Sequence, residues 1–394
     1  MISPLSRRSA LLGLGAAVSL DRASLAVAAT PTERRFVVVI LRGALDGLAA
    51  VAPYGDPALS GLRGELVSPP PGQPNGLLDL GGFYGLHPAL TGMHALYAAG
   101  QLLPVHAVAG SYRVRSHFEA QDYLESGADR RMSSGWLGRA VGQLTNGGAK
   151  EPSVAIGLSV PLLLRGPVPA GNWAPHGSAK TPPDLYAQIA ALHAGDRLTG
   201  PAIAAGLRER RFGDSVVTQT ELSGAKRYAF PALAAAAGEL LRAPGGPRIA
   251  ALELGGWDTH NAQSARLTAP LQELDAGLTA LKASLGDVWR QTAVLVMTEF
   301  GRTARINGTR GTDHGTATVA FVLGGSVAGG RVRATWPGLG AGKLFEDRDL
   351  APTTDLRSVA KGLLAQQLGL GEPALAQVFP DSQAAAPLTG LLRG

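Results

Sequence analysis

The sequence alternates between short, continuous apolar runs and longer segments whose apolar residues recur at helical spacing. Continuous apolar runs bounded by glycine or charge are typical of strands buried on both faces of a parallel sheet. Amphipathic segments between such runs are typical of helices that cover a sheet. The expected strands lie within residues 34–41, 102–110, 248–256, 292–301 and 318–325, and the expected helices lie within 87–100, 116–127, 184–195, 230–243 and 261–286.

This order of elements predicts an α/β fold with a mostly parallel central sheet flanked by helices, in one domain over residues 30–394. Two stretches rich in proline and glycine, 57–85 and 166–183, are expected to be surface loops. Functional residues of such sheets gather at the carboxyl ends of the strands. Four polar segments directly follow an expected strand, whereas GTDHG (311–315) precedes one.

Composition excludes several classes of site. The formal net charge is +6, but the basic residues are dispersed and no basic run is longer than RERR (208–211), which argues against nucleic-acid binding. The chain has no cysteine, so disulfides, thiolate metal sites and cysteine nucleophiles are excluded. A metal ion would have to be held by His, Asp, Glu or a hydroxyl group.

The N-terminal segment has the pattern of an export signal. Arg7 and Arg8 precede a short apolar stretch, and Ala26-Val27-Ala28 resembles a cleavage site. We therefore expect residues 1–29 to direct the protein through the twin-arginine translocation machinery to the periplasm or the medium. That route carries folded proteins, which suits a protein that acquires a metal ion in the cytoplasm. No later segment is expected to span a membrane.

Carboxylate and imidazole side chains follow the strand expected at 248–256. Asp258 and His260 lie two residues apart, so both can point to one face of an extended segment. This pair suits a hard or borderline divalent metal ion. In the simpler alternative, Asp258 caps the helix that begins near Asn261.

Two further segments carry the same chemistry. TEFGRT supplies Glu299 and Arg302, which could bind an oxyanion or form a buried ion pair. GTDHG supplies Asp313 and His314 between glycines, which would let the backbone approach a ligand closely. The alternative for GTDHG is a turn whose aspartate caps the next element.

Ser116 lies where the helix within 116–127 should begin. As an N-cap it would form a capping box with Glu119. The same position, at the positive end of a helix dipole, suits a nucleophile or an anion site. Arg115 and His117 add cationic or donor groups beside it. Asp46, before Gly47, belongs either to a simple turn or to the site.

These segments resemble two groups of proteins. LRGALDGLAAVAPYGDP, RSHFEAQDYLESG, GGWDTH, TEFGRT and GTDHGTATVAFVLGG are similar to the DUF1501 family of exported bacterial proteins, over nearly the whole chain after the signal. At a deeper level the chain resembles the alkaline phosphatase and sulfatase superfamily. That resemblance implies an alkaline phosphatase-like fold with Ser116 at the nucleophile position, and Phe300 stands where a second-site histidine belongs. Its implied metal ligands are Asp258, His260, His314 and Glu299, with Asp46 or Arg42 at the first-strand position.

The sequence thus leads to the hypothesis of an exported, metal-dependent hydrolase of phosphate or sulfate esters. Ser116 would attack an anionic small-molecule or glycan ester, and a zinc ion, with calcium or manganese as alternatives, would polarise it. Glu299 and Asp313 would bind the metal or orient its ligands. The non-bridging oxygens would be held by Arg302, Arg115 and His117. The alternative is a catalytically inactive, metal-containing binding or assembly protein of the cell envelope.

Overall fold

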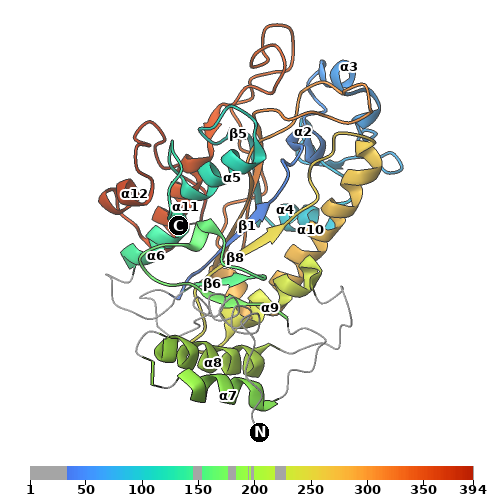
Figure 1. The fold of residues 1–394 in the computed structure, drawn as a ribbon. Coiled ribbons are helices and arrows are strands. Elements are labelled where there is room, and N and C mark those ends of the chain that lie inside the picture. The colour runs from blue at the N-terminus through green and yellow to red at the C-terminus, as the bar shows by residue number, and fades with distance from the viewer. Residues whose placement is uncertain are drawn as a thin grey trace.

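The structure is a computed structural model (Figure 1), and it describes residues 33–144, 153–175, 183–193, 195–196, 199–217 and 228–393. The expected export signal, residues 1–29, lies outside the described residues. Among the helices within those residues, none combines the length and the apolar character needed to cross a membrane.

The predicted α/β architecture is confirmed by a central sheet of eight strands, in the order β11-β5-β10-β9-β1-β8-β6-β7. All five strands expected from the apolar runs are present. The three that the sequence did not reveal are two to four residues long, too short for a distinct pattern. The strands are β1 (Arg35–Leu41), β5 (Leu102–Ala109), β6 (Ser153–Ile156), β7 (Gly171–Trp173), β8 (Ile249–Leu254), β9 (Thr292–Thr298), β10 (Thr318–Leu323) and β11 (Thr354–Asp355).

The sheet is parallel except for β10, which runs antiparallel to both β9 and β5. At the centre, β1 pairs in parallel with β8 and β9, so that Val38 lies between Ala251 and Leu295. Because β10 is reversed, its N-terminal end lies at the sheet edge where the parallel strands have their carboxyl ends. The GTDHG segment before β10 therefore reaches the same edge as the segments that follow β1, β8 and β9.

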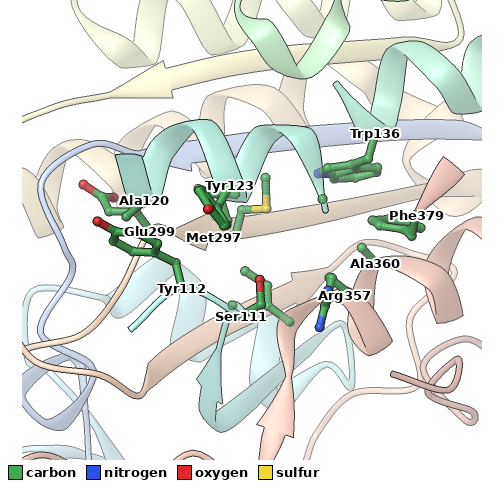
Figure 2. A pocket seen from close by; sticks show the side chains of 14 residues that line it. Ser111, Tyr112, Ala120, Tyr123, Trp136, Met297, Glu299, Arg357, Ala360 and Phe379 are labelled. Atoms are coloured by element: carbon green, nitrogen blue, oxygen red, sulfur yellow. The ribbon is translucent and has the colours of Figure 1, made fainter. Parts of the chain in front are cut away.

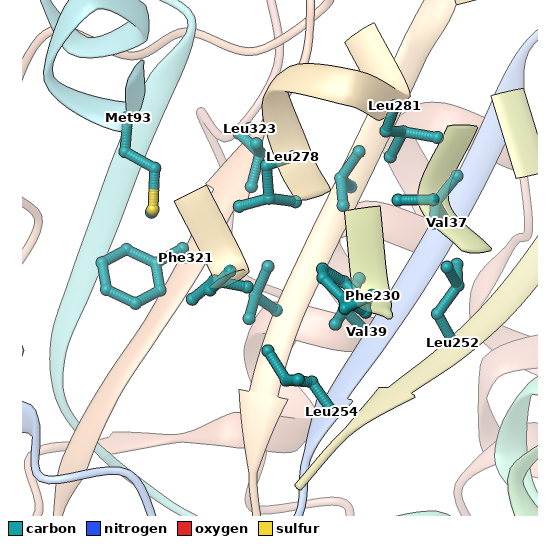
Figure 3. Close-up of a cluster of buried hydrophobic side chains, with 14 of the residues drawn as sticks. Val37, Val39, Met93, Phe230, Leu252, Leu254, Leu278, Leu281, Phe321 and Leu323 are labelled. Atoms are coloured by element: carbon teal, nitrogen blue, oxygen red, sulfur yellow. The ribbon is translucent and has the colours of Figure 1, made fainter. Parts of the chain in front are cut away.

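Helices cover both faces of the sheet, as predicted. On one face α4 (Thr91–Ala98), α9 (Phe230–Arg242) and α10 (Gln263–Leu285) belong to the buried cluster that contains Val37 and Val39 of β1 (Figure 3). On the other face α6 (Trp136–Leu144), α11 (Leu356–Leu368) and α12 (Glu372–Val378) belong to the cluster that contains Phe36 and Val38. Successive residues of β1 thus face opposite layers, which is why its apolar run is uninterrupted.

The remaining described elements are a second, smaller sheet, further helices and short 3-10 turns. The prediction that 57–85 is a loop was wrong in part, because this stretch contains a short helix and a strand of a second, three-stranded sheet ordered β2-β4-β3. The stretch 166–183 contains β7, and part of it lies outside the described residues. These elements are β2 (Val51–Ala52), β3 (Leu78–Asp79), β4 (Gly85–Leu86), α2 (Gly47–Ala50), α3 (Leu59–Arg63), α5 (His117–Ser126), α7 (Pro183–His193) and α8 (Thr199–Val216), with 3-10 turns at Gly64–Leu66, Leu162–Leu164 and Gly286–Gln291.

Candidate metal centre

Three histidines and one aspartate converge at the edge of the sheet described above. His117 is the first residue of α5, and His314 lies just before β10; their Nε2 atoms are 2.9 Å apart. Nε2 of His260, in the segment after β8, lies 3.0 Å from Nε2 of His314. Asp258 completes the group, with Oδ1 3.0 Å from His260 Nε2 and 3.3 Å from His314 Nε2. One ligand atom each from His117, Asp258 and His314 lies within 4.8 Å of the others.

The other ring nitrogen of each histidine has its own partner. Nδ1 of His117 lies 2.8 Å from Glu299 Oε1, and Nδ1 of His260 lies 3.0 Å from Asp313 Oδ1. Nδ1 of His314 lies 2.9 Å from the Arg115 carbonyl oxygen. These oxygens can only accept hydrogen bonds, so each Nδ1 carries a proton.

With the protons on Nδ1, the Nε2 lone pair of His314 faces those of His117 and His260 beside a carboxylate. Such an arrangement is repulsive unless a cation or a proton lies between the lone pairs. Imidazole nitrogens and a carboxylate oxygen also form a donor set that suits zinc, and oxygen partners on the far ring nitrogens are usual for metal-binding histidines. The residues present therefore fit a divalent metal ion.

Neighbouring charges and burial shift the pKa values of His117, His314 and Asp258. The hydrogen bond with Glu299 raises the pKa of His117, whereas burial lowers the pKa of His314. Burial alone would raise the pKa of Asp258, but the charge of Arg302, followed by those of the three histidines, lowers it below its usual value. Asp258 is thus held as a carboxylate.

Arg302 is a buried cation beside this group. Its side chain is 0% exposed, and Nη2 lies 2.8 Å from Asp258 Oδ1, an ion-pair distance. In the described part of the chain, none of its three guanidinium nitrogens has a hydrogen-bond partner of good geometry. Burial lowers the pKa of Arg302, yet a guanidinium remains charged in proteins. Apart from the contact with Asp258, the N–H groups of Arg302 thus have no protein partner among the described residues.

The two glycines of GTDHG pack against protein backbone. A Cβ at Gly311 would lie 2.3 Å from the carbonyl carbon and oxygen of His260. A Cβ at Gly315 would lie 2.3 Å from the carbonyl carbon of Arg302. The glycines were expected to let the backbone approach a ligand. In the structure they instead bring together the segments that carry His260, Arg302 and His314.

Ser116 is the N-cap residue of α5, as predicted, but it does not form a capping box. Its side chain makes no cap hydrogen bond, and the Glu119 carboxylate accepts a hydrogen bond from the Tyr112 hydroxyl. The Ser116 hydroxyl interacts with Tyr112 as well. Ser116 lies between Arg115, whose carbonyl oxygen contacts His314, and His117, whose side chain belongs to the centre.

Arg115 contributes its backbone to the site. Its φ of 65° is in the left-handed region, and its carbonyl oxygen holds His314. Its guanidinium group is paired with two carboxylates, Asp349, whose Oδ2 accepts from Nε at 2.9 Å, and Glu346. We expected this guanidinium to hold substrate oxygens, but in the structure it is already paired with these two carboxylates.

Asp46 is separate from the converging atoms. It caps α2 by accepting from the Leu48 and Ala49 amides, and it forms a fully buried ion pair with Arg63. Burial opposes the charge of Asp46, but Arg63 lowers its pKa below the usual range. The oxygens of Asp46 are occupied by these groups and by Gln263, so it anchors the structure behind the site.

Two other residues have places that the sequence left open. Asp313 accepts from Asn307 as well as facing His260, so it orients an imidazole. The ring of Phe300 packs against His117 and His314, with centroids 4.9 and 5.1 Å away. The side of the centre where a second-site histidine was expected is therefore closed by an apolar ring.

An apolar pocket lies beside Glu299, beneath α5 (Figure 2). It is lined by Tyr112, Trp136, Met297 and Phe379, and its volume is about 20 Å³. That is room for roughly one water molecule. It therefore cannot hold a substrate.

Sequence reasoning missed part of the site. It assigned His117 to substrate oxygens, whereas the structure turns its Nε2 toward His314. It also gave no role to Thr259, which separates two predicted ligands, or to Gln263 and Arg63, which lie in segments with no metal-binding pattern. A histidine beside the N-cap serine of a helix that starts at the sheet edge was the available signal for His117.

A profile described as "Protein of unknown function (DUF1501)" matches residues 99–379. No curated protein matches the sequence significantly. Among solved structures, the chain is similar to a protein in the alkaline phosphatase superfamily from Vibrio parahaemolyticus, with a TM-score of 0.37 and 10% identity over 80% of this chain and 65% of that one. It is also similar to the C-terminal periplasmic domain of EcEptC from Escherichia coli, in complex with Zn, with a TM-score of 0.32 and 11% identity over 76% of each chain. This chain thus spans just under two thirds of the Vibrio protein.

Proposed function

This chain belongs to the DUF1501 family, described as of unknown function, and we propose that it is an exported, metal-dependent hydrolase of phosphate or sulfate esters. One observation carries the proposal: three imidazole Nε2 atoms and a carboxylate converge beside a buried guanidinium with unused donors. The first part of this arrangement suits a metal cation, and the second suits an anion bound next to it.

The metal would be held by His117, Asp258, His260 and His314. Zinc suits this donor set best, and manganese or calcium are the alternatives. Bound there, the ion would act as a Lewis acid that polarises the ester and lowers the pKa of an attacking hydroxyl group. Glu299 would orient His117 from behind, as Asp313 and the Arg115 carbonyl would orient the other two rings.

Arg302 would bind the non-bridging oxygens of the substrate. Its planar, permanently charged group matches the oxygens of a phosphate or sulfate ester. Its ion pair with Asp258 already holds it in place, so little reorganisation is needed as charge develops in the transition state. The substrate would be an anionic small molecule or a glycan ester.

Ser116 would be the nucleophile. Its Oγ would lose its proton to water and form the new bond to phosphorus or sulfur, while the bond to the leaving ester oxygen breaks and that oxygen takes up a proton. Water would then hydrolyse the resulting serine ester. Two features support this role: the hydroxyl does not cap α5, and the residue stands at the positive end of that helix, directly before the ligand His117.

We further propose that residues 1–29 export the folded protein by the twin-arginine route. The paired Arg7 and Arg8, the short apolar stretch and the Ala-x-Ala end support this. The protein would then act in the periplasm or outside the cell. Residues 30–394 would form the mature enzyme.

Elemental analysis of the purified protein, followed by assays with phosphate and sulfate esters, tests the proposal. We expect about one zinc per chain and turnover that falls by on the order of 10³-fold in Ser116→Ala. Ser111→Ala, a serine substitution nearby after β5, is the matched control. Unchanged turnover in Ser116→Ala would remove the serine from the mechanism. Bound metal without hydrolysis of any ester would instead support a metal-containing binding or assembly protein.

A further inference from the structure

We propose that Gln263 is a positioning residue for the metal centre, because its buried amide ties together the two segments that carry most of the ligands. The inference rests on the proposed function in one respect only, that these ligands hold a metal ion. Gln263 itself touches none of the converging atoms.

The side chain of Gln263 joins two threonines from distant parts of the chain. Gln263 is the first residue of α10 and is 1% exposed. Its Oε1 accepts from Thr259 Oγ1 at 2.9 Å and from Thr312 Oγ1 at 2.6 Å. Thr259 separates Asp258 from His260, and Thr312 lies in GTDHG. Both threonines are buried, so neither hydroxyl can turn to solvent.

The direction of these hydrogen bonds is fixed by an ion pair. Nε2 of Gln263 donates to Asp46 Oδ2 at 2.5 Å, and Arg63 holds Asp46 as a carboxylate. A carboxylate only accepts, so the amide nitrogen of Gln263 has to face it. The amide oxygen is then left for the two threonine hydroxyls, and both must donate.

Arg63 extends the same network to a third segment. Its Nη2 donates to the Thr303 carbonyl and its Nε to the Ala304 carbonyl, each at 2.9 Å. These residues directly follow Arg302. The amide of Thr312 also donates to the Thr259 carbonyl at 3.3 Å, which joins the two ligand segments through the backbone.

Loss of the Gln263 acceptor should therefore loosen the ligands without removing any of them. Two buried hydroxyls would be left without an acceptor, an unfavourable state that is relieved if the segments move apart. Residues that orient metal ligands from behind typically change metal affinity by 10–100-fold when they are replaced.

Zinc affinity of the mature, metal-free protein tests this, measured by competition with a chromophoric chelator. We expect Gln263→Leu, Thr259→Val and Thr312→Val each to weaken zinc binding by about 10–100-fold. Thr259→Ser and Thr312→Ser, which keep the hydroxyl, should bind zinc like the wild type. Thr292→Val is the matched control, because Thr292 is buried and donates to the Val288 carbonyl at the far end of β9. Affinity within 2-fold of wild type in both valine variants would overturn the proposal.

Amide hydrogen exchange of the metal-free protein gives a second measure, independent of zinc. We expect exchange in 259–263 and 309–314 to be at least 10-fold faster in Thr312→Val than in wild type or Thr292→Val, which covers the case that Gln263→Leu does not fold. Unchanged exchange there would also overturn the positioning role. Wild-type protein that binds no zinc would contradict the proposed metal centre. Faster exchange in Thr312→Val would still support the role of Gln263 in holding the two segments together.

Discussion

The imidazoles of His260 and His314, which are 54 residues apart in the sequence, meet with their Nε2 atoms 3.0 Å apart. The contact depends on the reversed direction of β10, which brings the segment before that strand to the carboxyl ends of β8 and β9. Each ring is fixed from behind, His260 by Asp313 and His314 by the Arg115 carbonyl. The two rings are therefore held in place by the protein before any ligand arrives.

We predict that His314→Ala abolishes stoichiometric zinc binding. His314 is the member whose Nε2 lies near those of both His117 and His260, so its loss leaves the remaining ligands without their common neighbour. Isothermal titration of the metal-free protein would measure this. His94→Ala is the control, since Nε2 of His94 lies 3.0 Å from the Asp79 carbonyl oxygen and its ring stacks on Tyr97, with no contact to the converging ligands in the described structure. Equal zinc affinity in His314→Ala and the control would contradict the assignment.

Arg302→Met should weaken the binding of anions. The buried guanidinium offers charged hydrogen bonds, worth about 1.5–3 kcal/mol in such settings, so we expect the inhibition constant of inorganic phosphate to rise by about 10–100-fold. Inhibition of ester hydrolysis at fixed zinc would measure this. Arg310→Met, at an exposed arginine 3.9 Å from Glu65, should leave the constant unchanged. Unchanged phosphate inhibition in Arg302→Met would mean that the anion binds elsewhere.

The pH dependence of zinc binding should report the contact between His117 and Glu299. Protons compete with the metal at Nε2, and the raised pKa of His117 extends that competition to higher pH. Glu299→Gln removes the main cause of the raised pKa, so the midpoint of zinc binding should move to lower pH. The affinity at alkaline pH should fall, because the ring is less well oriented. A midpoint that moves to higher pH, or does not move, would contradict this. Glu253→Gln is the control, because Glu253 pairs with Arg42 and not with His117.

The sequence predicted the strands of the core well because its apolar runs are long and uninterrupted. β1 packs against a helical layer on each face, and such burial leaves a clear pattern. The same reasoning placed Asp258, His260 and Glu299 at strand ends, where the sheet brings them together. β6 and β7 are too short to leave a pattern, and the direction of β10 depends on pairing that no local pattern encodes.

The division of roles within the site could not be predicted in the same way. An aspartate or glutamate has the same chemistry whether it binds a metal or a histidine ring, and only its neighbours decide. Asp46 is paired with Arg63, and Glu299 lies at hydrogen-bond distance from Nδ1 of His117, because segments apart in the sequence pack together. Arg115 likewise donates a hydrogen bond to Asp349, which lies more than two hundred residues later in the sequence.

The glycines of GTDHG give a last prediction. Gly311 has the carbonyl carbon and oxygen of His260 2.3 Å from the position of a Cβ, closer than real Cβ contacts, and both belong to backbone that cannot turn aside. Gly311→Ala should therefore push the His260 segment away and weaken zinc binding by about 10-fold or more, the range seen when ligand orientation is lost.

Gly308→Ala is the matched control, three residues earlier in the same segment, because nothing lies within 4 Å of its Cβ position. It should bind zinc like the wild type and be slightly more stable, since alanine has less conformational freedom to lose on folding. Chelator competition on both variants, with thermal unfolding of the metal-free forms, would measure the difference. Equal zinc affinity in the two variants would mean that His260 tolerates displacement, and its role as a ligand would then fail.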